Sequence, residues 1–259
     1  MDRRLQVACV WSILAFAVLF GIGCFVLAGF IPPPSPAATA QAIAHLYSSR
    51  AQAIRIGCTL MMLGTPFILS WGSAIAVQVR RMERGVPILT YMMVACDGFA
   101  VMNVALTVVF WAAAAFRPDD VSPDVTRALN DVGWFLFNLQ WPVFCVWFLC
   151  IAVATLRDRN LPRIFPRWVA NVNVLTAVLS APYGLTLFFK EGPLSGRGVI
   201  GFFLPTVVTF AWLLVMSVVA IRAINAVDGH TSAAVPLERD IRLSGPSAGR
   251  TAPGVTTDG

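Results

Sequence analysis

Long apolar runs constrain this chain more than any other feature of its sequence. Each run ends at a charge, a proline or a glycine. A helix of about 20 apolar residues is long enough to cross the hydrocarbon of a bilayer. Only 12% of the 259 residues are charged, against about a quarter in soluble domains, so the sequence predicts an integral membrane protein. The runs cover about residues 7–31, 53–79, 87–115, 132–156, 168–189 and 198–221.

The expected fold class is all-α, a polytopic membrane bundle of about six transmembrane helices. The bundle should occupy residues 1–225 as one domain. Its first run is longer than the apolar segment of about 7 to 15 residues in a cleaved signal peptide, which favours a retained helix. Residues 226–259 are rich in Gly, Ser, Thr, Ala and Pro. Such a segment buries too little surface to offset its ordering entropy, so we expect a disordered tail.

Basic residues suggest the orientation of the bundle. Arginines concentrate in the two short loops 80–85 and 157–167 and precede the first run. Short loops rich in arginine and lysine remain on the cytoplasmic side of a membrane. Both chain ends should therefore be cytoplasmic, and we expect the protein in the cell (inner) membrane of a bacterium.

Two loops on the opposite side carry helical patterns. Ala40, Ile43 and Tyr47 recur at helical spacing within residues 37–50 and predict an interfacial helix. Ser122-Pro123-Asp124 combines an N-cap residue, a proline and an acid. This motif, followed by Val125, Leu129 and Val132 on one helix face, predicts a second short surface helix.

Charged residues should form a rim on this outer side. One interpretation is a solvated rim in which opposite charges neutralise each other, and the other is a gate or polar entrance over the bundle. The rim residues that could form such an entrance are Arg55, Arg117, Arg127 and Asp131.

Several chemistries lack the residues they need. The only histidines are His45 and His230, both outside the apolar runs, so haem, di-iron and zinc sites built on histidine pairs are not expected. We assign no metal, cofactor or catalytic residue. The basic residues are spread among loops without a nucleic-acid motif, so no nucleic-acid partner is expected. Expected partners are membrane lipid, a small apolar or amphipathic ligand and a protein in the membrane.

Asp97 is the only acidic residue inside a predicted span. It follows Pro87 by ten residues, which places it near the middle of a bilayer at about 1.5 Å per residue. Insertion of an aspartate at that depth costs about 3 kcal/mol, so such a residue faces the bundle interior and finds a partner. A neutral Asp97 would serve proton coupling or ligand binding. The alternative is a structural hydrogen bond between helices.

Other polar residues could share a seam with Asp97. Asn138 and Gln140 enter the fourth span from the outer side, and Asn173 begins a polar stripe in the fifth. These residues either line a binding or proton-coupling site or hold helices together through hydrogen bonds. Asn103 lies about 120° around the helix from Asp97, so we do not expect it in the same site.

Prolines fall inside four predicted spans. Each proline removes a backbone hydrogen bond and frees a carbonyl group. Kinked helices favour a bundle that encloses a cavity, although proline also occurs in transmembrane helices without a functional role. Trp141, Phe144 and Trp147 could line an apolar pocket. The expected kinks lie at Pro66, Pro142, Pro182 and Pro205.

Three functions agree with these features. The first is small-molecule transport or lipid handling through a cavity that contains Asp97. The second is a non-catalytic accessory or scaffold subunit of a membrane complex. The third is an integral-membrane enzyme that acts on an apolar lipid or terpenoid. For this function Asp97 would need a second titratable group, with Asp131 and Arg55 as the candidates.

Overall fold

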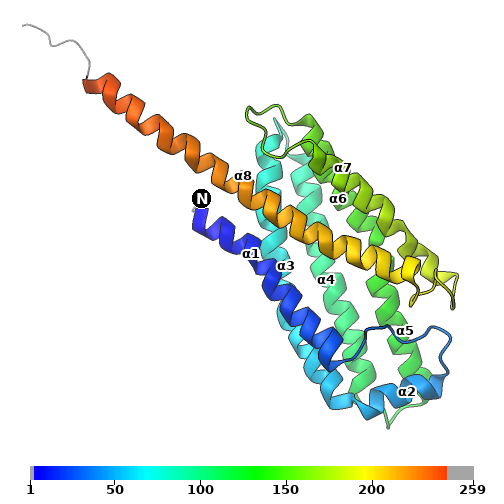
Figure 1. Cartoon of the computed structure of the whole chain (residues 1–259). Helices are drawn as coiled ribbons and strands as arrows, with labels where there is room; N and C mark the ends of the chain where they lie inside the picture. The colour runs from blue at the N-terminus through cyan, green and yellow to red at the C-terminus, as the bar shows by residue number, and fades with distance from the viewer. Residues whose placement is uncertain (1–2, 244–259) are drawn as a thin grey trace, which may run out of the picture. The chain divides into compact units, whose positions relative to one another are not determined.

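The computed structural model describes residues 3–243, with side chains described for residues 3–226. Every regular element in the described part is a helix (Figure 1). The chain divides into a compact unit of residues 1–224 and a second unit of residues 225–259. The helical bundle discussed below is the first unit.

The bundle is built from helices in the following order. The elements are α1 (Arg3–Gly21), the π-helix η1 (Ile22–Leu27), α2 (Ala40–Ser49), α3 (Ala51–Met82), α4 (Ile88–Phe116), α5 (Pro123–Leu139), α6 (Trp141–Arg157), α7 (Trp168–Ser180), the 3-10 helix η2 (Ala181–Leu187), the π-helix η3 (Val199–Phe203) and α8 (Leu204–Leu243).

Five helices of the described residues are long and apolar enough to cross a membrane, which is compatible with a membrane protein. The predicted span 168–189 is not among them. There the α-helix is 13 residues long and gives way to a 3-10 helix at Ala181, beside Pro182. The count of six spans and the orientation in the membrane stay predictions.

The five long helices are Arg3–Leu27, Ala51–Met82, Ile88–Phe116, Pro123–Arg157 and Val199–Ala226.

The short surface helix expected at Ser122 is not a separate element. It is the first part of α5, which runs from Pro123 into the fourth predicted span. The proline at the helix start and the N-cap position of Ser122 agree with the prediction. The helix continues past Val132, and its residues Gly133 and Trp134 are buried.

The bundle boundary at residue 225 and the disordered tail stay predictions. α8 continues as a helix to Leu243, beyond the predicted bundle boundary at residue 225. Extension of an existing helix adds one hydrogen bond per residue without a new nucleation step. Residues 244–259 lie outside the described residues, so the prediction of disorder is not tested there.

Close helix packing begins at the first two long helices. α1 packs on α3, α3 on α4, and α4 on both α5 and α6. At the contact of η1 with α3, a Cβ atom on Gly23 would overlap the carbonyl oxygen of Gly57, and the reverse holds for Gly57. Glycines therefore allow the two backbones to touch, as small residues do between membrane helices.

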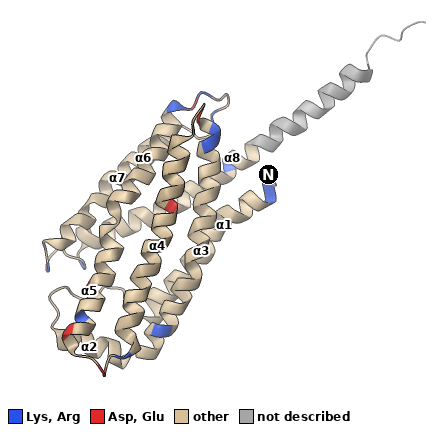
Figure 2. Ribbon diagram, turned by 180° about the vertical axis from the view of Figure 1, so that it is seen from behind, with Lys and Arg blue, Asp and Glu red and all other residues tan. Residues whose placement is uncertain are grey.

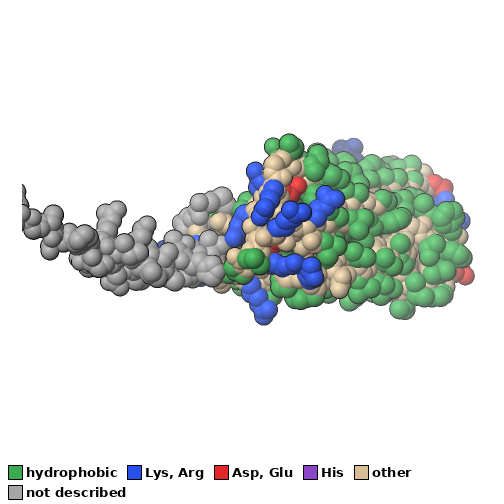
Figure 3. All heavy atoms as spheres, turned by 90° about the horizontal axis from the view of Figure 1, so that it is seen from above, with side chains coloured by type: hydrophobic (Ala, Val, Ile, Leu, Met, Phe, Trp, Pro, Cys, Tyr) green, Lys and Arg blue, Asp and Glu red, His purple; other side chains and the backbone are tan. Residues whose placement is uncertain are grey.

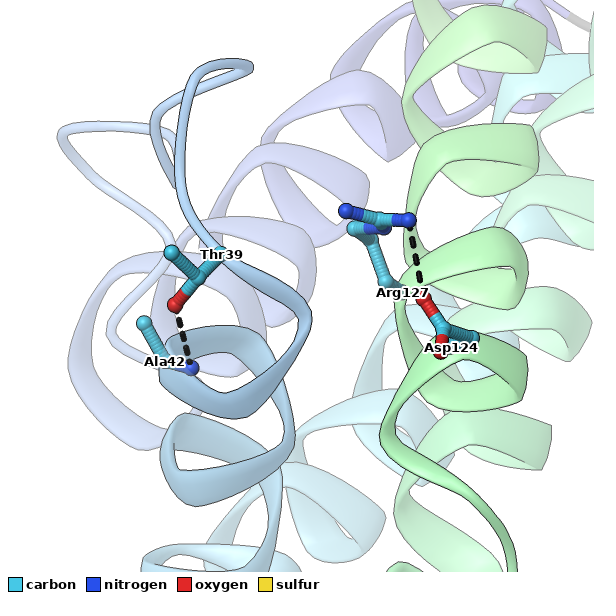
Figure 4. Close-up of polar contacts among 4 residues, drawn as sticks. All are labelled: Thr39, Ala42, Asp124 and Arg127. Atoms are coloured by element: carbon cyan, nitrogen blue, oxygen red, sulfur yellow. Dashed lines mark hydrogen bonds and ion pairs between the residues drawn. The ribbon is translucent and has the colours of Figure 1, made fainter.

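The helix predicted for residues 37–50 is present as α2. Thr39 is its N-cap, and the Ala42 N–H donates to the Thr39 hydroxyl over 3.2 Å (Figure 4). Ala40, Ile43 and Tyr47 are buried, and α2 packs against α5. The pattern therefore marked the face that packs on the bundle. An interfacial position in a membrane stays a prediction.

Three of the four span prolines coincide with helix transitions. Pro142 follows the break at Gln140 between α5 and α6, Pro182 lies in η2, and Pro205 lies at the junction of η3 and α8. Pro66 does not interrupt α3. The Thr65 hydroxyl donates to the Met62 carbonyl oxygen, the group that Pro66 leaves without its usual backbone donor.

Most of the charged residues lie at the two ends of the bundle (Figure 2). The arginine end comprises the α3–α4 loop, residues 83–87, and the α6–α7 loop, residues 158–167. The proline end comprises residues 28–39, α2 and the η2–η3 loop. Figure 3 views the arginine end, where basic side chains cluster above hydrophobic flanks.

Candidate functional site

A cavity of about 100 Å³ lies inside the bundle. Its walls are mostly aromatic, and we call it the aromatic cavity. Trp141, Phe144 and Trp147 are among the lining residues, in agreement with the pocket predicted on the fourth span. The other aromatic residues that line it are Phe16, Phe20, Trp71, Phe137, Tyr183, Phe210 and Trp212.

Three tryptophans from three helices form one wall of the aromatic cavity. The ring centre of Trp71 lies 5.3 Å from that of Trp212 and 6.0 Å from that of Trp147, with interplanar angles of 74° and 61°. Such edge-to-face pairs add about 1 kcal/mol each beyond the burial of their area. The wall therefore holds α3, α6 and α8 together and resists collapse into the cavity.

Two indole N–H groups of this wall are anchored outside the cavity. Trp71 donates to the Ser217 hydroxyl over 2.8 Å, and Trp212 donates to the Asn173 side-chain oxygen over 2.9 Å. Asn173 is fully buried and also donates to the Val169 carbonyl. Asn173 is not among the cavity-lining residues. Asn173 was predicted either to line a site or to form a hydrogen bond between helices, and its bond to Trp212 is of the second kind.

Gln140 is the predicted site residue that lines the aromatic cavity. It sits at the break between α5 and α6 and donates to the Phe137 carbonyl over 3.0 Å. Asn103 of α4 donates to the Gln140 side-chain oxygen over 2.7 Å and to the Leu136 carbonyl over 2.8 Å. The two amides thus satisfy carbonyl groups at the break, where regular backbone bonding stops. Asn103 therefore supports Gln140, although it is not among the residues that line the aromatic cavity.

Asp97 lies outside the lining of the aromatic cavity. Its side chain is 1% exposed and lies against the α3 backbone, where a Cβ atom on Gly72 would overlap the carboxyl group. Neither carboxyl oxygen has a hydrogen-bond partner within the described residues. Asp97 is not among the residues that line the aromatic cavity, whereas Ala100, one turn further along α4, is.

Asn138 faces a second pocket, at the proline end. This pocket of about 340 Å³ is lined by Asn138, Arg127, Asp131 and Lys190 and by the prolines of residues 33–36. The Asn138 side-chain oxygen is buried without a partner in the described chain. Asp97, Asn138, Gln140 and Asn173 therefore do not share the polar seam that was considered for them.

The rim residues do not form one network. Arg127 pairs with Asp124 over 2.9 Å (Figure 4). Arg55 donates to the Ala51 carbonyl of its own helix, and the guanidinium of Arg117 lies 5.1 Å from the Phe116 ring centre. Whether Arg55, Arg117, Arg127 and Asp131 act as an entrance stays a prediction.

Asp131 takes part in a buried chain of polar groups with α2. Tyr47, fully buried, donates to the Asn130 side-chain oxygen over 3.2 Å, and Asn130 donates to Asp131 over 3.0 Å. Burial raises the pKa of Tyr47 well above its ordinary value of 10.0, and nearby Cys58 and Asp131 add to the shift. The phenol is therefore held in its neutral, donating form.

Some residues of the site come from distant helices and were not identified from the sequence. Trp71, Trp212 and Tyr183 had no local signal that distinguished them from ordinary apolar packing. Gly72 stands beside Trp71, and only the contact with Asp97 reveals why a side chain is absent there. The helix break was signalled by Pro142, two residues after Gln140.

The arrangement combines an apolar, aromatic interior with few polar contacts. Within residues 3–226, no group of three or more His, Cys, Asp or Glu side chains lies together in a way that could hold a metal ion. Comparison of the chain with protein-family models, curated proteins and solved structures finds no match.

Proposed function

We propose that this chain is an integral membrane protein that binds an apolar small molecule or a lipid chain in the aromatic cavity, as a carrier or lipid-handling protein does. The observation that supports the proposal is the cavity itself, which has aromatic walls and only a few polar lining groups. Ligand sites are mostly apolar and use a small number of polar groups to orient the ligand.

The volume limits what the cavity accepts. An engineered apolar protein cavity of about 150 Å³ binds benzene, so the 100 Å³ available here suits one ring or a short alkyl end. Sites for larger ligands measure about 300 Å³ or more. A larger ligand therefore requires the walls to move apart.

Helix transitions next to the cavity provide a place for that movement. α5 and α6 meet at Gln140, and α7 becomes a 3-10 helix after Ser180. Both residues line the cavity. A break in backbone bonding lets two helix segments tilt separately, so we expect the α5–α6 break to open when a ligand enters. Gln140 is the polar group we assign to ligand orientation.

The first test asks whether the full-length protein carries a ligand. The protein is extracted into native-lipid nanodiscs, and native mass spectrometry identifies the bound small molecules. Ala100→Phe fills the cavity, because Ala100 lines it and is 1% exposed. We expect the bound molecule to be lost. Ala113→Phe is the matched control, since Ala113 is exposed on the same helix.

Overpacking at Ala100 can itself cost about 1–3 kcal/mol, so a second variant makes the test independent of folding. Phe144→Ala enlarges the cavity and should admit a larger molecule or more of the same one. The proposal fails if wild type carries only bulk lipid. It also fails if Ala100→Phe folds and keeps the same ligand.

Asp97 retains its proposed role in proton coupling, although it does not line the cavity. Its buried carboxyl group lies between α3 and α4, each of which contributes lining residues. A change in its protonation would thus act on the cavity through helix packing. Asp97→Asn should leave ligand occupancy intact and remove any dependence of occupancy on pH. Unchanged pH dependence would argue against this role.

The scaffold-subunit and enzyme alternatives stay predictions. The enzyme alternative asked for a second titratable group, with Asp131 and Arg55 as the candidates. Asp97 has no hydrogen-bond partner among the described residues, which argues against either candidate acting directly with it. Co-purification of the intact protein with one stoichiometric partner would favour the scaffold alternative.

A further inference from the structure

A pocket at the arginine end is distinct from the aromatic cavity. It measures about 740 Å³ and lies between the α3–α4 loop and the α6–α7 loop. Residues from both loops and from the ends of α4 and α6 line it, among them Glu83 and Asp158. We call it the arginine pocket, after the four basic residues on its wall: Arg84, Arg157, Arg159 and Arg163.

The two acids of the pocket are already engaged by the backbone. Glu83 accepts from the N–H groups of Leu89 and Thr90, over 2.8 and 3.0 Å, at the start of α4. Asp158, 2% exposed, accepts from the N–H groups of Asn160 and Ile164, over 2.9 and 2.8 Å. Each acid thus stabilises a loop or a helix start, where backbone donors lack partners.

The four arginines are left without partners of opposite charge. Across residues 3–226, none of them makes an ion pair or a side-chain hydrogen bond. One guanidinium nitrogen of Arg163 is buried and unpaired. A buried donor without an acceptor costs about 1–3 kcal/mol, and more when it is charged. Arg84, Arg157 and Arg159 are exposed, and an anion in the pocket would pair with such accessible guanidinium groups.

Apolar side chains beside the arginines are exposed to the surroundings of the protein. Val86 and Ile88, which line the pocket, are 78% and 58% exposed. Leu161, at the tip of the α6–α7 loop, is 93% exposed. A free anion in water would leave these groups uncovered, whereas a lipid supplies both a phosphate and acyl chains.

We propose that the arginine pocket binds the phosphate headgroup of an anionic membrane lipid, with the acyl chains against the apolar residues at the pocket edge. Guanidinium groups bind phosphate oxygens through paired, charge-assisted hydrogen bonds. Basic pockets near a membrane surface recognise anionic headgroups in this way. The proposal rests on the membrane part of the proposed function and is independent of the aromatic cavity.

The test measures lipid binding to the purified full-length protein in detergent. Native mass spectrometry follows titration with phosphatidylglycerol, with phosphatidylcholine and with inorganic phosphate in separate arms. We expect phosphatidylglycerol to bind most strongly. The double variant Arg157→Gln/Arg163→Gln should weaken phosphatidylglycerol binding about tenfold or more, because two charge-assisted bonds are lost.

Arg167→Gln is the matched control. Arg167 is exposed in the same α6–α7 loop but does not line the pocket, and its loss should change binding by less than about twofold. An equal loss of phosphatidylglycerol binding in the control and the double variant would show that only the overall charge of the protein matters. That result would overturn the proposal. Equal binding of phosphatidylcholine, or inorganic phosphate that binds as well as the lipid, would overturn it too.

A measurement on wild type keeps the proposal testable if the double variant does not fold. Phosphatidylglycerol should raise the thermal unfolding midpoint of wild type more than phosphatidylcholine does, because a ligand that binds the folded state stabilises it. Equal midpoints would contradict the proposal. Loss of the cavity ligand in Ala100→Phe with phosphatidylglycerol binding intact would separate this site from the proposed function.

Discussion

Asp97 and Asp158 are buried to almost the same extent but have opposite surroundings. Asp97 is 1% exposed and Asp158 is 2% exposed. Asp158 accepts two backbone hydrogen bonds and one from the Asn160 side chain, whereas Asp97 has no partner in the described chain. Burial of a carboxyl group is costly unless hydrogen bonds compensate it. The burial of Asp158 is thus explained by structure alone, and that of Asp97 is not.

The difference indicates which of the two buried acids is the candidate for a functional role. An acid that accepts hydrogen bonds from a loop backbone contributes to stability, because its removal leaves backbone N–H groups without an acceptor. An acid that faces a glycine backbone without a hydrogen bond contributes nothing comparable, so its presence in α4 needs another reason. The following five predictions either break this contrast or sharpen it.

The largest effect is expected for Asp158→Ala. Removal of the carboxyl group leaves the backbone N–H groups of Asn160 and Ile164 without an acceptor and deletes the bond from the Asn160 side chain. We expect a loss of about 3 kcal/mol in the free energy of unfolding. The measurement is helical circular dichroism during titration with a denaturing detergent. Asp124→Ala is the control, because its ion pair with Arg127 is exposed and should cost less than about 1 kcal/mol. Equal costs would contradict the role given to Asp158.

Gly72→Ala should have the next largest effect. The new methyl group would overlap the carboxyl group of Asp97, and overpacking of this kind costs about 2 kcal/mol. Gly98→Ala is the control, since nothing lies within 4 Å of a Cβ atom there. It should stabilise the helix by about 0.5 kcal/mol.

A double variant tests the Gly72 contact directly. Gly72→Ala combined with Asp97→Ala should recover most of the lost stability, because the overlapping carboxyl group is gone. The same unfolding titration measures the recovery. Additive effects of the two substitutions would show that they do not touch.

Tyr47→Phe extends the contrast to a third buried titratable group, one with a single partner. Loss of the hydrogen bond to Asn130 should cost about 1 kcal/mol. The raised pKa of folded Tyr47 stabilises the protein fully below the unfolded value near 10.0, and this contribution declines as the pH rises above it. Unfolding midpoints at about pH 9 and about pH 11 should therefore differ less in Tyr47→Phe than in wild type. An unchanged difference would contradict the buried neutral phenol.

Asp97→Asn should have the smallest effect on stability. The amide has the same shape and no hydrogen bond is lost, so we expect a change within about 0.5 kcal/mol. Unfolding of the variant beside wild type in the same detergent measures it. A loss above about 2 kcal/mol would reveal a structural role and end the contrast with Asp158.

Much of the helix pattern was predictable because it depends on local properties. Apolar length, the helical spacing of Ala40, Ile43 and Tyr47 and the Ser122-Pro123 start are read directly along the chain, and α2 and the five long helices follow from them. The end of α7 was not predictable in the same way. The run continues past Pro182, but the helix changes type there, because hydrogen bonding and not hydropathy decides where an α-helix stops.

The candidate site was predictable only in part. Gln140 and the aromatic residues of α6 were identified from their depth in the span, and the cavity contains them. Asn103 was set aside by its rotation relative to Asp97 and yet bonds to Gln140. Rotation around one helix says which residues share its face, but it does not say which neighbouring helix that face meets.

The sequence by itself determined that the chain forms apolar helices of membrane-spanning length, with arginines in the loops that meet at one end. Both are consequences of composition and local hydrogen bonding. Only the tertiary structure decided that Asp97 lies against Gly72 and that Asp158 and Glu83 accept hydrogen bonds from the backbone. It also decided that, among the described side chains, Asp97 and four arginines have no partner. These features depend on contacts between distant segments, which arise when helices pack, and no local pattern encodes them.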